Sequence, residues 1–293
     1  MFTPRSFLFV PGDSARKMAK AGSSGAHALV LDLEDAVAAE SLPAARQLVR
    51  EYLLDHADRS RQQIWVRINP VDGDQALADL AQIVAGAPDG LLLPKCGSGE
   101  EVVRLGHYLT ALEAREGVAP GTTKIVVVAT ETPGSIFELG SYSSAGPRLH
   151  GLTWGAEDLS TAVGASTNRN DDGTYALVYQ LARTLCLLGA KAAGVHAIDT
   201  ITPDFRDSEG LAREVRRARQ DGFTAKFAIH PDQVAIINEG FRPDAREVEH
   251  ARAIVAAFEA AGRAGAAQLH GMMLDRPHLT QALQILEAAG AAR

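Results

Sequence analysis

The chain is poor in cysteine, in long apolar runs and in basic charge, and each shortage argues against a class of protein. Its two cysteines, Cys96 and Cys186, lie 90 residues apart without CxxC spacing, which disfavours a disulfide scaffold or a zinc ribbon. No apolar run approaches the roughly 18 residues of a membrane helix. The first residues hold only four consecutive apolar side chains, too few for a signal peptide, so we expect a cytoplasmic protein that binds no membrane. A net charge of −7 without a long Lys/Arg run argues against nucleic-acid binding.

Short β-rich segments alternate with helical segments along most of the chain. A hydrophobic fraction of 46% in 293 residues provides for a large core. The alternation predicts right-handed crossovers and a parallel sheet, and eight units favour a closed (β/α)8 TIM barrel as the catalytic domain over residues 1–240. No Gly-x-Gly-x-x-Gly follows a strand, which disfavours an open dinucleotide-binding sheet. The predicted strands are 6–10, 28–32, 64–68, 90–94, 125–129, 149–154, 194–198 and 226–230.

Residues 241–293 follow the eighth predicted strand and form an extension. The spacing of apolar residues predicts one long amphipathic helix over 243–265, then a turn and a final helix. No segment rich in Pro, Gly or Ser separates this region as an independent domain. We therefore expect a C-terminal helical extension that packs on the barrel or on a neighbouring subunit.

Polar residues follow the apolar part of most predicted strands. Taken singly, such a residue is more often a helix cap or an ion-pair member than a ligand. Side chains alternate along a strand, so Asp32 and Glu34 should share one face, as should Arg67 and Asn69 on the next strand. Because parallel barrels carry their active sites at the carboxyl ends of the strands, this convergence predicts an active site. Its candidates are Asp32, Glu34, Arg67, Asn69, Lys95, Glu131, Glu157, Asp158 and His230.

Glu131 and Asp158 end successive predicted strands, which lie roughly 5 Å apart in a sheet. Without a cation, two carboxylates this close would repel, and the pKa of one of them would rise. Two carboxylates completed by water and substrate oxygens suit Mg²⁺, with Mn²⁺ as a possible substitute. No pair of histidines has the i,i+4 spacing of a zinc helix, so zinc is disfavoured. The sequence therefore predicts Glu131 and Asp158 as metal ligands.

Nine motifs in order make the chain similar to a known family. They are RSFLFVPG, LDLEDAV, VRINP, LLLPKC, ETPGS, GAEDLS, AIDT, KFAIHPDQ and GMMLDRPH. Together they resemble the citrate lyase β-subunit-like branch of the HpcH/HpaI aldolase family, nearly from end to end. Two departures, Ala225 where relatives often have Gly and Pro133 where Ala is common, touch no expected ligand.

The resemblance implies roles for individual residues. Glu131 and Asp158 match the family's Mg²⁺ ligands, and Glu131 would also contact substrate. Arg67 is similar to the arginine that contacts the carbonyl oxygen where enolate charge develops. Asp275 is similar to an aspartate that relatives insert into a neighbouring subunit's site, which implies a homotrimer. Positions that match further catalytic or substrate-contacting residues are Glu34, Asp35 and Lys95.

The chemistry implied by the resemblance is cleavage between the α and β carbons of a β-hydroxyacyl-CoA thioester. Malyl-CoA or citramalyl-CoA would give acetyl-CoA plus a 2-oxo acid, glyoxylate or pyruvate, and a substrate with an α-methyl group would give propionyl-CoA instead of acetyl-CoA. The same reaction can run as a condensation. Three alternatives stay open: a citrate lyase β subunit with an acyl-carrier partner, a thioesterase or synthase of the same family, and a barrel that has lost catalysis.

Two further expectations concern coenzyme A and assembly. The basic cluster nearest a strand end is ARKMAK, where Arg16, Lys17 and Lys20 are candidates for CoA phosphate contacts. A solvated first helix explains this cluster equally well. Likewise, the apolar residues before Asp275 predict burial against a neighbouring subunit. The alternative is that Met272–Leu274 pack on their own barrel and Asp275 caps the last helix.

Overall fold

The computed structural model describes residues 3–262 and 266–290. The chain forms two compact units, Met1–Asn238 and Glu239–Arg293, and each is described by itself. Within the described ranges no helix is long and apolar enough to cross a membrane.

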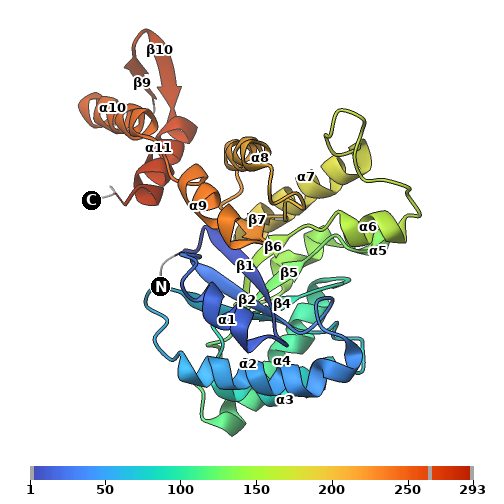
Figure 1. The fold of residues 1–293 in the computed structure, drawn as a ribbon. Coiled ribbons are helices and arrows are strands. Elements are labelled where there is room, and N and C mark those ends of the chain that lie inside the picture. The colour runs from blue at the N-terminus through green and yellow to red at the C-terminus, as the bar shows by residue number, and fades with distance from the viewer. Residues whose placement is uncertain (1–2, 263–265, 291–293) are drawn as a thin grey trace. The chain divides into compact units, whose positions relative to one another are not determined.

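The first unit is built on a closed barrel of eight parallel strands, in chain order, which confirms the predicted (β/α)8 fold (Figure 1). Residues Phe7 and Leu8 of the first strand pair with Phe227 and Ala228 of the last, and this pairing closes the barrel. The strands are β1 (Ser6–Pro11), β2 (Ala28–Asp32), β3 (Gln63–Arg67), β4 (Gly90–Leu93), β5 (Lys124–Val128), β6 (Leu149–Thr153), β7 (His196–Asp199) and β8 (Ala225–Ala228).

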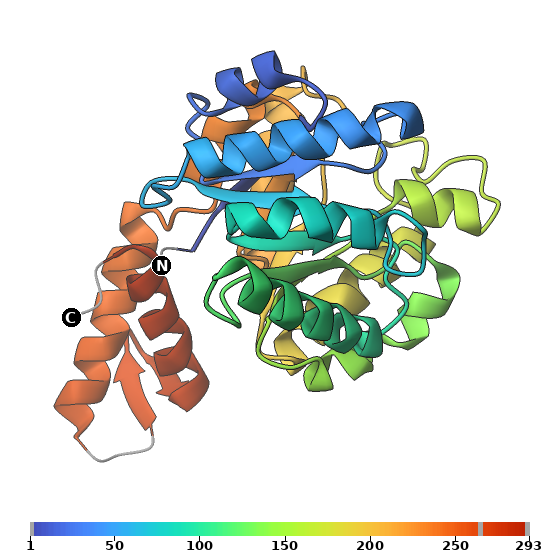
Figure 2. The same cartoon turned by 90° about the horizontal axis from the view of Figure 1, so that it is seen from below.

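Helices follow the strands and cover the outside of the barrel. Their apolar residues recur every three or four positions, as in Leu42, Ala45, Val49 and Leu53, so one face of the helix is buried. The helices α2, α3 and α4 lie side by side on this outer surface (Figure 2). The helices are α1 (Ala15–Ala21), α2 (Leu42–Asp55), α3 (Ala76–Ile83), α4 (Gly99–Glu116), α5 (Pro133–Phe137), α6 (Glu157–Ala162), α7 (Leu177–Ala192), α8 (Ser208–Asp221) and α9 (Pro231–Gly240), with short 3-10 turns at Ala39–Ser41, Val84–Gly86 and Leu139–Ser144.

Large apolar side chains fill the interior of the barrel, so the barrel is a packed core. Trp65 is 2% exposed and packs edge-on against Phe7, with ring centroids 5.7 Å apart. Gly90 on β4 makes room for Trp65, because a Cβ at position 90 would lie 2.2 Å from the indole ring. This close packing gives the strand ends above it a rigid support.

The second unit contains a β-hairpin where the sequence predicted a turn, and this part of the prediction was wrong. The helix α10 (Ala245–Ala261) is followed by the antiparallel strands β9 (Ala266–Leu269) and β10 (Met272–Asp275), then by α11 (Arg276–Ala288). The two residues between the strands, His270 and Gly271, have φ of 49° and 81°, as a type I′ hairpin turn requires. The predicted helix 243–265 ends at Ala261, and positions 263–265 lie outside the described residues.

Candidate active site

A cavity of about 470 Å³ opens at the carboxyl ends of the barrel strands, where barrel enzymes bind their substrates. One part of its lining is apolar and consists of Phe9, Leu92, Val128, Trp154, Ile201 and Phe227. The charged part consists of Asp32, Asp35, Arg67, Glu131, Glu157 and Asp158. Five of the nine strand-end candidates therefore line one cavity: Asp32, Arg67, Glu131, Glu157 and Asp158.

Arg67 is held by three carboxylates from the end of β2. The register of the sheet places it beside Asp32, whose two oxygens accept from Nε at 2.7 Å and from the second terminal nitrogen at 2.6 Å. The other terminal nitrogen contacts Glu34 Oε2 at 2.9 Å and Asp35 Oδ2 at 3.4 Å. Burial by itself would lower the pKa of Arg67, but the bonds and charge of these carboxylates outweigh it and raise the pKa. Arg67 therefore stays positive at the cavity wall.

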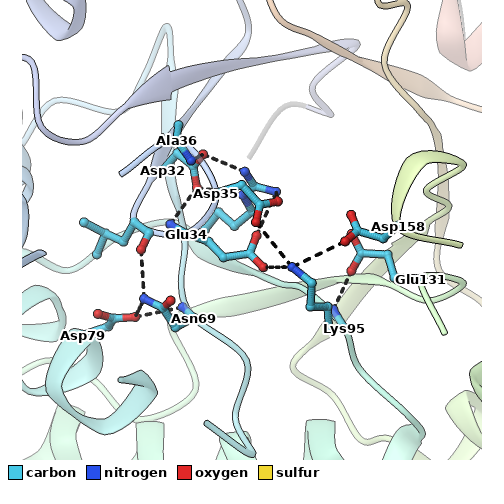
Figure 3. A network of polar contacts seen from close by, with 11 residues as sticks. Asp32, Glu34, Asp35, Ala36, Asn69, Asp79, Lys95, Glu131 and Asp158 are labelled. Atoms are coloured by element: carbon cyan, nitrogen blue, oxygen red, sulfur yellow. Dashed lines mark hydrogen bonds and ion pairs between the residues drawn. The ribbon is translucent and has the colours of Figure 1, made fainter. Parts of the chain in front are cut away.

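Lys95 joins the two halves of the site. It follows β4 with a left-handed φ of 50°, which is uncommon for a residue with a side chain and is typical of functional positions. Its ammonium contacts Glu34, lies 3.4 Å from Asp35 and lies 3.6 Å from Asp158, while its backbone N–H donates to Glu131 at 2.5 Å. Figure 3 shows the Lys95 side chain between one pair of acids, Glu34 and Asp35, and a second pair, Glu131 and Asp158. One residue therefore links the end of β2 to the ends of β5 and β6.

Glu131 is a buried carboxylate with too little positive charge around it. It is only 5% exposed. Burial, with the negative charges of Asp158 and Glu34, raises its pKa to about 8, although the N–H and charge of Lys95 oppose this. Gly155 allows the close approach, because a Cβ there would lie 3.1 Å from the Glu131 side chain.

We call Asp32, Glu34, Asp35, Arg67, Lys95, Glu131 and Asp158 the open cluster, because most of these residues line the cavity. Five carboxylates meet two basic groups here, which leaves three negative charges uncompensated. No three Asp, Glu, His or Cys side chains among the described residues come close enough to hold a metal alone. Mg²⁺ needs only one or two carboxylates, since water and substrate oxygens complete its shell. Glu131 and Asp158 thus fit a Mg²⁺ ion that substrate helps to bind.

Some strand-end residues do not reach the cavity. Asn69 was expected on the face of Arg67, but β3 ends at Arg67 and the Asn69 amide instead donates to Asp79 at 2.9 Å and to the Leu33 carbonyl at 2.8 Å (Figure 3). It thereby supports the backbone before Glu34. His230 does not line the cavity either; its backbone N–H donates to Gln233, as expected for a turn residue.

The basic residues Arg16, Lys17 and Lys20 lie exposed on α1, just after β1, and none of them lines the cavity. Ser14 caps the start of this helix, and Met18 is its buried anchor. Three exposed cations on one short helix remain available to a phosphate group.

Asp275 lies in the second unit at the N-terminal cap of α11, which is the place that the helix-cap alternative predicts. Its side chain is 57% exposed, and Nδ1 of His278 lies 2.5 Å from its Oδ1. Leu274 is buried in the core of this unit, whereas Met272 and Met273 are 57% and 78% exposed. Only one of the three apolar residues is therefore accounted for by packing within the unit.

Two features of the site were not assigned from the sequence. Asp32 was expected at the strand end but not as the bidentate partner of Arg67, and it also accepts from the backbone N–H groups of Glu34 and Ala36. Trp154, which was not among the candidates, also lines the cavity. The signal for Asp32 was present in LDLEDAV, since Asx side chains commonly bond to backbone N–H groups just after them.

The fold and the site together define a TIM barrel with a cluster of acidic residues and one arginine at the carboxyl ends of its strands. The profile of the HpcH/HpaI aldolase/citrate lyase family matches residues 5–231, and the chain belongs to this family.

Related proteins align with almost the whole chain. The citrate lyase subunit beta of Haemophilus influenzae is 34% identical over 97% of this chain and 96% of its own length. A (3S)-malyl-CoA thioesterase of Cereibacter sphaeroides is 34% identical over 98% of this chain and 95% of its own. The crystal structure of CitE from Mycobacterium tuberculosis, in complex with magnesium, acetoacetate and coenzyme A, is 34% identical, covers 98% of both chains and superposes with a TM-score of 0.80.

Proposed function

We propose that this chain is a Mg²⁺-dependent carbon–carbon lyase that acts on a β-hydroxyacyl-CoA thioester such as malyl-CoA or citramalyl-CoA. The observation that carries the proposal is the open cluster, where surplus carboxylates and one partly buried arginine meet at a cavity whose remaining lining is largely apolar. The bond between the α and β carbons breaks, the β-hydroxyl loses its proton, and the products are a 2-oxo acid and an acetyl-CoA or propionyl-CoA enolate that gains a proton. The relative solved with magnesium, acetoacetate and coenzyme A supports this class of ligand.

Glu131 and Asp158 are the residues that would hold the metal. When bound, Mg²⁺ supplies Lewis-acid polarisation of the oxo-acid carbonyl and a template for its carboxylate. The Lys95 backbone N–H orients one oxygen of Glu131 and leaves the other for the ion. The Lys95 ammonium draws Asp158 toward the same side of the cavity.

Arg67 would stabilise the enolate oxygen of the thioester. Its hydrogen bonds to Asp32 and Asp35 use three of the five N–H groups of the guanidinium, and Glu34 adds an ion pair at 2.9 Å. A further N–H can therefore donate to a substrate oxygen. Because the carboxylates fix the guanidinium beforehand, no reorganisation is needed as charge develops, which makes such a donor effective. Glu34 and Asp35 act here by holding Arg67 and Lys95 in position.

The residues that line the cavity also bear on which 2-oxo acid the site would bind. Of the described residues that line the cavity, Arg67 alone is basic. A second carboxylate, as in oxaloacetate, would lack a basic partner there, whereas the hydrogen of glyoxylate or the methyl of pyruvate suits the apolar part. We therefore place glyoxylate and pyruvate before oxaloacetate, and this ranks the CoA lyase before the citrate lyase subunit.

A product assay tests the proposal. The protein is incubated with malyl-CoA, citramalyl-CoA and citryl-CoA, with Mg²⁺ or with EDTA, and the oxo acid, the acyl-CoA and the free thiol are measured separately. We expect oxo acid and acyl-CoA in equal amounts, no free thiol, and loss of turnover in EDTA. Free thiol with intact hydroxy acid would instead identify a thioesterase, the activity named for the Cereibacter relative. Absence of any product would reject catalysis on these thioesters.

We further propose that Asp275 moves the proton in the site of a neighbouring subunit, within a homotrimer. It is exposed, and two exposed methionines precede it on β10, which suits a segment that another subunit covers. Mixing Asp275→Asn with Asp158→Ala subunits should restore part of the activity that each variant alone has lost. Exchange between two Asp275→Asn preparations, one of them tagged, is the control. A mixed oligomer that stays inactive after proven exchange would contradict a role in trans.

A further inference from the structure

A buried lysine lies at the β8 side of the cavity, away from the open cluster. Lys226 is 1% exposed, and its ammonium donates to Asp199 Oδ2 at 3.0 Å and to the Thr200 carbonyl at 2.7 Å. Glu214 Oε2 lies 3.7 Å away. Such a position is costly for a charge without partners, and here two N–H groups of the ammonium donate and two carboxylates lie nearby.

Asp199 also contacts Trp154, a second residue of the cavity wall. Its Oδ1 accepts from the indole N–H of Trp154 at 2.8 Å, and Arg183 Nε lies 3.4 Å from the same oxygen. Burial opposes ionisation of Asp199, but Lys226, Arg183 and these hydrogen bonds outweigh it and lower its pKa. We call Asp199, Lys226, Arg183 and Glu214 the closed cluster.

The atoms that the closed cluster holds belong to cavity-lining residues. Trp154 follows β6 and Thr200 follows β7, and both line the cavity. The segment beyond Thr200 is held as well, since Thr202 donates to Glu214 at 2.5 Å and its carbonyl accepts from Gln233 at 2.9 Å. One buried pair thus fixes the loops that follow two neighbouring strands.

Stability alone does not account for this arrangement. Replacing a buried ion pair by neutral side chains of similar size is often neutral or stabilising, so a buried pair is weak evidence for a stabilising role. A second buried pair in the same unit, Arg148 with Glu113 at 2.6 Å, is not part of the lining of this cavity, and Arg148 also donates to the Thr123 carbonyl and to Thr110. The Arg148–Glu113 pair therefore serves as the control for the Lys226–Asp199 pair, and we call it the comparison pair.

We propose that Lys226 and Asp199 are positioning residues that hold Trp154 and Thr200 in place as part of the cavity wall, against which the acyl part of the substrate is oriented. The role in turnover rests on the proposed lyase function. The positions of Trp154 and Thr200 do not depend on that function, so they can be tested separately. Displacement of such a wall by about 1 Å can lower a rate by up to roughly a hundredfold.

The test compares two matched double variants. Asp199→Asn/Lys226→Met removes two of the four charges of the closed cluster, those of the buried pair, but keeps an amide oxygen for the Trp154 indole. Glu113→Gln/Arg148→Met makes the same chemical changes in the comparison pair. We expect similar shifts of the melting temperature in both, and a loss of kcat/KM of about tenfold to a hundredfold only in the first, mostly in kcat. Equal losses in both, or none in the first, would overturn the proposal.

A second measurement needs no turnover. The chain has two tryptophans, so 5-fluorotryptophan labelling gives two ¹⁹F resonances, and a Trp65→Phe variant assigns them. Trp65 donates to Gln63 at 2.9 Å and is the internal reference. Asp199→Asn/Lys226→Met should move the Trp154 resonance and leave that of Trp65 in place. Glu113→Gln/Arg148→Met should move neither resonance. An unmoved Trp154 resonance would overturn the proposal even if the lyase activity is proven. A moved one would support the fixed wall even if the protein turns over no CoA thioester.

Discussion

Two charged clusters lie at the same end of one barrel and differ in their charge balance. The open cluster has five carboxylates and two basic groups, and most of its residues line the cavity. The closed cluster has two carboxylates, Asp199 and Glu214, and two basic groups, Lys226 and Arg183. Lys226 and Asp199 are almost fully buried.

The balance of charge decides what each cluster can bind. In the open cluster the pKa of Glu131 is raised to about 8, because burial and neighbouring acids disfavour its charged form. In the closed cluster the pKa of Asp199 is lowered, because its basic partners outweigh the burial. A carboxylate of the first kind gains from an added cation, and one of the second kind already has its partner. The first cluster is therefore suited to a metal, and the second to holding the wall.

The largest expected effect comes from the acids of the open cluster. Glu131→Gln and Asp158→Asn should each lower kcat by about a thousandfold or more, because each would remove one of the two proposed charged ligands of the metal. Calorimetric titration with Mg²⁺ should show no binding to either variant, while circular dichroism stays native. Asp199→Asn in the closed cluster is the control and should keep its Mg²⁺ affinity. Wild-type turnover by Glu131→Gln in EDTA would refute the metal assignment.

Arginine-to-lysine changes compare the two clusters at the level of the cation. Arg67→Lys should lower kcat by about a hundredfold, with a smaller change in KM, because lysine keeps the charge but loses the planar fork that three carboxylates hold. Arg183→Lys in the closed cluster should change kcat far less. Steady-state kinetics of both variants measures this difference. An unchanged kcat for Arg67→Lys would assign Arg67 to substrate binding or packing.

The pH dependence of stability should differ in sign between the clusters. A carboxyl whose folded pKa is raised binds its proton more tightly in the folded state, so the metal-free protein loses stability as pH rises from about 4.5 to about 8. The Glu131 contribution is about 1.4 kcal/mol per pH unit in that window. Asp199, with a lowered pKa, adds stability that is lost only when pH falls below its ordinary value of 3.8.

Urea unfolding in EDTA at pH 5, 6, 7 and 8 checks this difference. Glu131→Gln cannot titrate at this position, so its stability should fall less with pH than that of the wild type, and added Mg²⁺ should restore the wild type most at pH 8. Parallel profiles of the two proteins would contradict the raised pKa.

The smallest expected effect lies outside both clusters, on α1. Reversing the charge of Lys17 or Lys20 to Glu should raise KM for the CoA substrate by about tenfold, since a charged hydrogen bond to phosphate contributes about 1.5–3 kcal/mol. The control is Arg50→Glu, which changes an exposed cation on α2. No change of KM for either lysine variant would identify α1 as a solvated helix.

The barrel and most of the open cluster could be predicted because both depend on short-range patterns. Short β-rich segments mark the strands, which are four to six residues long. The carboxyl ends of parallel strands must meet, so Glu131, Asp158 and Arg67 were brought to one place by topology alone. The hairpin at 266–275 was missed because four-residue strands with mixed polarity resemble a helix connection, and the His270–Gly271 turn is a weak signal. Asn69 was misplaced because alternation stops where β3 ends.

The sequence by itself determined the eight strands, their order and the polar residues that follow them, because these are local properties of the chain. Only the tertiary structure decided which acids face a cation and which do not. Lys226 and Asp199 look in sequence like any polar residues of a strand, and their pairing depends on the register of β7 against β8, which places them side by side. Likewise, the raised pKa of Glu131 depends on burial and on charged neighbours, Glu34, Lys95 and Asp158, that follow three other strands. No single segment of the sequence contains all of these groups.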